Sequence, residues 1–98
     1  MRTDYPVIME KTVLIKNKQG LHARPAALFV QIANKFNSEI TISKGKTKVN
    51  GKSIMGIMML EAGCGVRVII AASGDDAAQA VEELEKVLLS DTEDMTMI

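Results

Sequence analysis

Two short segments in the middle of the chain, residues 39–43 and 47–49, alternate polar and apolar side chains and lie only three residues apart. Such alternation is typical of strands with one buried face. The link Lys44-Gly45-Lys46 suits a hairpin turn, and strands joined by a hairpin pair antiparallel. This part of the chain therefore predicts an antiparallel sheet.

The remaining strands and the short helix follow from equally local patterns. Residues 11–16 and 66–72 are β-branched apolar runs, which indicate strands. Residues 54–60 are apolar and follow Ser53, a residue type that commonly caps a helix N-terminus. We therefore expect a short helix there, with Ser53 as its N-cap.

Two longer helices are predicted from apolar residues at three- and four-residue steps. The first starts near Pro25, whose missing N–H is harmless in a first turn, and ends at residues 37–38. The second spans residues 77–88, with acids at 75–76 near its positive end. The order strand, helix, strand, strand, helix, strand, helix predicts an α+β fold with helices gathered on one face of the sheet.

Length and composition restrict the class of protein. With 98 residues the chain suits one domain, and we expect a core of about residues 10–90 with frayed ends. Twelve basic and twelve acidic residues cancel, and aromatics make up 3%, which disfavours nucleic-acid binding. No signal-peptide pattern or membrane-length apolar run appears. A lone cysteine forms no internal disulfide, so we expect a reducing, cytoplasmic location.

Residues 20–25, Gly-Leu-His-Ala-Arg-Pro, carry the chemistry. They put the chain's single histidine, His22, at a predicted helix start, although histidine is a poor N-cap. Unpaired N–H groups of Ala23 and Arg24 would meet an anion on the imidazole there. The Arg24 guanidinium would add a charge-assisted contact to phosphate. We therefore interpret His22 as a nucleophile and Arg24 as its anion-stabilising partner.

Simpler interpretations of these residues stay open. His22 would also fit a surface position without a role. One histidine and one distant cysteine do not provide the ligands of a zinc site, so we expect no metal. Cys64, between two glycines, would also fit a reactive thiol.

The short predicted helix is apolar almost all round, so it cannot bury every side. We expect Ile57 and Leu60 to enter the core and some of Ile54, Met55 and Met58 to be exposed. The methionines would also fit positions in the core. Flexible thioethers suit a surface that accepts several partners.

The segments 21–27, Leu-His-Ala-Arg-Pro-Ala-Ala, and 52–58, Lys-Ser-Ile-Met-Gly-Ile-Met, together resemble the two motifs of the HPr family. This family comprises the phosphocarriers of the bacterial sugar phosphotransferase system, and the resemblance spans about residues 11–89. It implies an open-faced β-sandwich, with four antiparallel strands and three helices on one side.

The resemblance also implies a function without a cofactor. HPr-like proteins accept a phosphoryl group from phosphorylated Enzyme I on the active-site histidine, by family habit at Nδ1, and pass it to enzyme IIA components. His22 matches that histidine, and Arg24 matches its phosphate-stabilising partner. Ser53 matches the serine that an HPr kinase/phosphorylase modifies in many bacteria, where the product assists a catabolite-control transcription regulator.

Partner proteins are expected to dock around His22 and the short helix of a monomeric carrier. The expected contacts are close approach at Ala23 and Ala27, charge pairing at Lys52, and burial of three apolar side chains, Ile54, Met55 and Met58. The presence of His22 disfavours a sibling used only for regulation, which lacks the histidine. A nitrogen-related branch and a binding module without chemistry stay open, whereas no second catalytic group supports a stand-alone enzyme.

Overall fold

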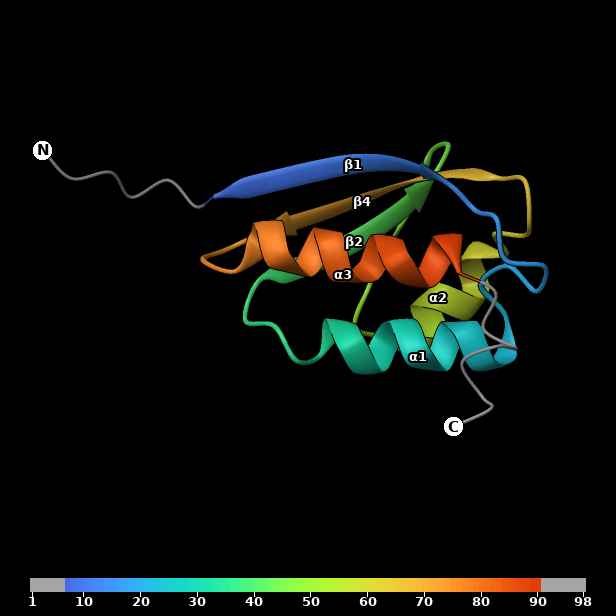
Figure 1. Cartoon of the computed structure of the whole chain (residues 1–98), viewed down its shortest axis with the longest axis horizontal. Helices are drawn as coiled ribbons and strands as arrows, with labels where there is room; N and C mark the ends of the chain where they lie inside the picture. Colours follow the sequence, from blue (N-terminus) through green and yellow to red (C-terminus); the bar gives the residue numbers. More distant parts are fainter. Residues whose placement is uncertain (1–6, 91–98) are drawn as a thin grey trace, which may run out of the picture.

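Four strands form one antiparallel sheet in the computed structural model, which describes residues 7–90 (Figure 1). Their order across the sheet is β1 (Ile8–Leu14), β4 (Arg67–Ser73), β2 (Glu39–Lys44) and β3 (Thr47–Asn50). The predicted hairpin joins β2 to β3, and Lys44 pairs with Thr47, so the turn itself is Gly45 and Lys46. In the register, Ile42 lies opposite Val49 on one side and Ile70 on the other, which gives the sheet one apolar face.

Three helices, α1 (Ala23–Ala33), α2 (Ile54–Leu60) and α3 (Ala77–Leu89), cover that apolar face and leave the other face open (Figure 1). Burial alternates along β4, where Val68, Ile70 and Ala72 point toward the helices. The helices contribute mainly small and branched side chains to the core, around Phe29 and Leu84. The predicted α+β open-faced sandwich is therefore confirmed.

One strand and one helix have ends that differ from those predicted. The first strand begins at Ile8 rather than residue 11, because Ile8 and Met9 pair with the far end of β4. The first helix ends at Ala33 rather than at residues 37–38, because Asn34 caps it with both its backbone N–H and its side-chain amide on the Val30 carbonyl. The expectation of frayed ends falls largely on residues 1–6 and 91–98, outside the described residues.

The start of α3 is fastened to the loop between α1 and β2. Asp76 is the N-cap residue of α3, at the positive end of the helix as expected, but its side chain makes no capping hydrogen bond to the helix. Its carboxylate instead accepts hydrogen bonds from the Asn37 N–H at 2.9 Å, the Ser38 N–H at 3.0 Å and the Ser38 hydroxyl at 2.5 Å. The Ser38 hydroxyl, followed by the Asn37 N–H, lowers the pKa of Asp76 below its ordinary value.

The Asp76 clamp makes stability depend on pH. A carboxyl with a lowered folded-state pKa stabilises the fold above its unfolded-state pKa, about 4, and this contribution is lost as the pH falls through the lower folded value. We therefore expect D76N to be less stable than the wild type at pH 7, with the difference shrinking as the pH falls below about 4. Denaturant unfolding of both proteins between pH 7 and pH 3 measures this. A constant difference over that range would show that the carboxylate charge is unimportant to the clamp.

Candidate functional site

His22 is the N-cap residue of α1, as predicted, and its side chain is exposed. Its backbone is extended, with φ −125° and ψ 156°, and its imidazole makes no capping hydrogen bond. The first N–H groups of a helix have no acceptor within the helix. Among residues 7–90, the Ala23 and Arg24 N–H groups find no other acceptor. The imidazole therefore stands beside free donors at the positive end of a helix, where an anion is stabilised.

Ala23, directly after His22, has φ +47°, in the left-handed region that alanine rarely adopts. A residue in this conformation is strained by about 1–2 kcal/mol and persists only where its surroundings hold it. Such strain occurs often at functional sites. The strain thus falls on the first residue of α1, directly after the nucleophilic candidate.

Arg24, in the first turn of α1, is exposed and has no hydrogen bond or ion pair within the described part of the chain. Its guanidinium is therefore available to an anion near the helix start. Ala23 and Ala27 are also exposed, one turn apart on α1, and their small side chains permit close approach of another surface.

The loop before His22 is fixed by contacts with the segment that follows α2. Gly20 has φ +63°, as expected for a turn glycine, and a Cβ there would lie 2.6 Å from the Gly63 Cα atom. The Leu21 N–H donates to the Ala62 carbonyl at 2.8 Å, and the Leu21 side chain is completely buried. The exposed imidazole is therefore carried on a backbone fixed to the segment that follows α2.

Ser53 caps α2, as predicted, by accepting the Gly56 N–H at 3.1 Å on its hydroxyl oxygen. Ile57 and Leu60 are buried, which is also as predicted. Four large apolar side chains of α2 remain exposed, and we call them the α2 patch: Ile54 (44% exposed), Met55 (69%), Met58 (43%) and Met59 (71%).

Met59, the most exposed side chain of the α2 patch, was not predicted to belong to it. At 100° per residue, Met59 and Met55 lie on the side of α2 opposite the buried pair Ile57 and Leu60. The helical period alone would have identified it.

The two helices of the site run in opposite directions. At one end, the Asn34 side-chain amide donates to the Lys52 carbonyl at 3.3 Å, just before α2 begins. At the other end, Leu21 is bonded to Ala62, just after α2 ends. Since the eleven residues of α1 span about 16 Å, Ser53 and His22 lie at opposite ends of the site.

This arrangement changes the expected surroundings of His22. The last turn of α2, with Met58 and Met59, lies toward the imidazole, whereas Ile54 lies toward the far end of α1. Ser53 is correspondingly too distant to touch a group on His22.

Lys52 is less available than expected. Its ammonium donates to the Phe36 carbonyl at 2.7 Å, so it closes the far end of α1 rather than projecting freely toward a partner. Its carbonyl accepts from Asn34, and its N–H donates to the Asn50 side chain at 2.8 Å. Lys52 therefore acts mainly to join α1 to α2.

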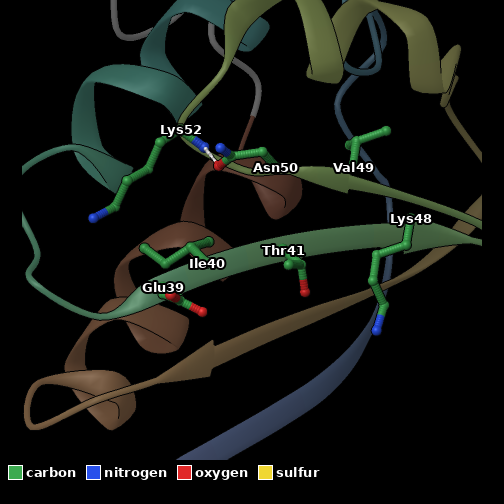
Figure 2. Close-up of a pocket in the computed structure, with 7 residues that line it drawn as sticks. All are labelled: Glu39, Ile40, Thr41, Lys48, Val49, Asn50 and Lys52. Carbon is green, nitrogen blue, oxygen red and sulfur yellow. Dashed lines mark hydrogen bonds between the residues drawn. The ribbon is translucent and has the colours of Figure 1, made fainter.

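Other features of the described residues do not extend this site. A hollow of about 470 Å³ lies over β2, β3 and the turn to Lys52 (Figure 2), and neither His22 nor Arg24 lines it. Residues 7–90 contain no cluster of side chains that could hold a metal ion and no helix able to cross a membrane. Cys64 is exposed, and its Sγ atom lies 3.8 Å from the Lys16 carbonyl.

Comparisons with known proteins agree with this geometry. The PTS-HPr family, described as "PTS HPr component phosphorylation site", matches residues 9–90. The HPr-like protein Crh of Halalkalibacterium halodurans is 53% identical over 77 residues, which cover 79% of this chain and 92% of the relative.

Solved structures give the same result in three dimensions. The phosphocarrier protein HPr of Bacillus anthracis is 48% identical with a TM-score of 0.81, over 83% of this chain and 96% of that one. An HPr dimer from Thermoanaerobacter tengcongensis is 50% identical with a TM-score of 0.61, over 86% and 91% of the two chains.

Proposed function

This chain belongs to the PTS-HPr family, and we propose that it is the phosphocarrier between Enzyme I and the enzyme IIA components of a sugar phosphotransferase system. The observation that carries this proposal is the exposed imidazole of His22 beside unpaired helix donors and an unengaged guanidinium. Relatives of nearly equal identity bear the names Crh and HPr, so overall identity alone does not choose between regulator and carrier. His22, which regulation-only siblings lack, favours the carrier.

The proposed transfer needs no cofactor. A neutral ring nitrogen of His22, Nδ1 by family habit, attacks the phosphorus of the phosphohistidine on Enzyme I. The new N–P bond forms as the donor's N–P bond breaks, and the electron pair returns to the donor imidazole. The same exchange then passes the group to a histidine of enzyme IIA. The free N–H groups of Ala23 and Arg24 and the Arg24 guanidinium stabilise the transferred phosphoryl oxygens.

Docking is proposed to bury the α2 patch together with Ala23 and Ala27. Ala23, Ala27 and the last turn of α2 lie toward the His22 end of α1, and Ile54 extends the apolar surface toward the other end. The flexible thioethers of the patch adapt to more than one partner. The contact is proposed to be small and transient, as suits a carrier that must leave each partner quickly. We propose a cytoplasmic, monomeric carrier, although the T. tengcongensis dimer shows that a family member can assemble in pairs.

Incubation with phosphoenolpyruvate and Enzyme I tests the carrier function directly. We expect one acid-labile phosphate per chain, detected by intact-mass measurement, and its loss on addition of an enzyme IIA component. Failure of the wild-type chain to accept phosphate would overturn the proposal and favour the binding module that works without chemistry.

Ser53 is proposed as a regulatory phosphorylation site for an HPr kinase/phosphorylase, with a catabolite-control regulator as partner of the product. Its hydroxyl caps α2, and a phosphate there would add a negative group at the helix N-terminus, where the helix dipole favours it. The distance from His22 exceeds the Debye length of about 8 Å in physiological salt, so direct repulsion between the two sites is screened. The phosphate would act on docking, beside the α2 patch.

The S53D variant is therefore expected to raise the KM for phosphorylated Enzyme I by about tenfold. This corresponds to a binding free energy weaker by about 1.4 kcal/mol. The hydrolysis rate of the phosphohistidine in the isolated protein should stay at the wild-type value. Steady-state transfer kinetics and the decay of acid-labile phosphate measure the two effects. S53A serves as the uncharged control, and an S53D variant that accepts phosphate as fast as S53A would contradict the docking mechanism.

A further inference from the structure

Asn17 is a buried polar residue outside the site described above. Its side chain is 2% exposed, and its Oδ1 atom has no hydrogen-bond partner among residues 7–90. The other buried polar residue, Ser38, is fully explained by its bonds to Asp76. An unpaired buried acceptor destabilises a fold, and an apolar side chain of similar size would avoid that loss. The presence of asparagine at this buried position therefore needs an explanation other than packing.

The contacts of Asn17 close the turn that leads to His22. Its side-chain amide donates to the Gly20 carbonyl at 3.1 Å, and its own carbonyl accepts the Gly20 N–H at 3.1 Å. The two bonds close the turn of residues 17–20 from both sides. The Asn17 N–H also reaches the Leu88 carbonyl at 3.4 Å, next to the stronger Lys16–Leu88 bond of 2.9 Å.

Only Leu21 separates this turn from His22, so the position of the turn determines where the imidazole is carried. Gly20 is packed against Gly63, Leu21 is bonded to Ala62, and His22 follows immediately, before the strained Ala23. His22 itself has no side-chain capping bond to fix it. Its position therefore depends on the closed turn before it and the helix after it.

We infer that Asn17 is a positioning residue for His22, retained because its amide closes the 17–20 turn despite the unpaired Oδ1. It acts through the backbone and touches no phosphoryl group. This inference rests on the proposed function of His22 as phosphoryl acceptor. Since small displacements of a reacting group reduce transfer rates strongly, loosening the turn should slow chemistry without weakening docking on α1 and α2.

The N17L variant tests this inference because leucine has the same branching and the same number of non-hydrogen atoms, and removes both the amide donor and the unpaired acceptor. We expect the kcat for phosphoryl transfer from Enzyme I to fall about tenfold, with the KM changed less than twofold. N17D, which keeps the shape but replaces the donor by an oxygen, should show the same split and serves if N17L does not fold.

N34L is the matched control. Asn34 also donates its side-chain amide to backbone carbonyls, but at the end of α1 remote from His22. At an equal loss of unfolding free energy, N34L should keep the wild-type kcat. Wild-type kcat in both N17L and N17D, or an equal fall of kcat in N34L, would overturn the inference.

A readout without Enzyme I separates this inference from the proposed function. NMR relaxation of the His22 backbone should show greater disorder in N17L than in N34L. If wild-type protein accepts no phosphate, the proposed function fails, and unchanged His22 order in N17L would then reject the positioning role independently.

Discussion

The H22A variant is expected to accept no phosphoryl group from phosphorylated Enzyme I while keeping the wild-type fold. His22 is the chain's single histidine, so no second imidazole can take over. Its side chain is exposed and makes no capping bond, so its removal should change the unfolding free energy by no more than about 0.5 kcal/mol. Intact-mass measurement after incubation with phosphoenolpyruvate and Enzyme I gives the first result, and denaturant unfolding gives the second.

Two outcomes would contradict this expectation in different ways. Stoichiometric acid-labile phosphate on H22A would place the acceptor on another residue. Loss of phosphate acceptance together with a large loss of stability would mean that the imidazole supports the fold, contrary to its exposed position. If a regulatory effect on transcription survived in H22A, the binding-module interpretation would gain support.

The parts of this molecule that sequence reasoning predicts well are those governed by neighbouring residues. Alternation along β2 and β3 and the glycine between them specify the hairpin. The hydroxyl of Ser53 specifies the start of α2, because a cap needs an acceptor only three residues before the N–H it binds. The position of His22 at the start of α1 is predicted in the same way, from Pro25 and from the helical spacing of the apolar residues after it.

The parts that sequence reasoning does not predict depend on contacts between distant segments. The Lys52 ammonium meets the Phe36 carbonyl, sixteen residues earlier, a contact that was not predicted, and its pairing with a partner stays a prediction. Asp76 lies at the start of α3 as expected, but its hydrogen bonds to a loop 38 and 39 residues away were not predicted. Local patterns carry no information on which distant carbonyl or N–H a long or charged side chain will meet.

The orientation of α2 has the largest functional consequence among these contacts. Motif spacing along the chain does not reveal that Met58 and Met59, rather than Ile54, lie toward His22. The bonds Leu21–Ala62 and Asn34–Lys52 establish it, because they tie opposite ends of α2 to opposite ends of α1. In the proposed docking, a partner at His22 would therefore contact Met58 and Met59 rather than Ile54.

The G20A variant is expected to lose about 3 kcal/mol of unfolding free energy. We also expect it to lose phosphoryl transfer from Enzyme I. Gly20 has φ +63°, which costs any L-residue about 1 kcal/mol or more. A Cβ at Gly20 would also lie 2.6 Å from the Gly63 Cα atom and 2.7 Å from the Ala62 carbonyl oxygen. Both are backbone atoms, so relief requires the His22 loop to move away from the segment after α2. Denaturant unfolding measures the stability loss, and transfer from Enzyme I measures the displacement.

G45A separates the two causes. Gly45 has nearly the same conformation, with φ +59°, but a Cβ there meets nothing within 4 Å. Its substitution should therefore cost only the conformational part, about 1 kcal/mol, and leave transfer at the wild-type rate. Equal losses of stability in G20A and G45A would mean that the backbone conformation alone matters. In that case the close packing of Gly20 on Gly63 would not be what holds the loop of His22 in place.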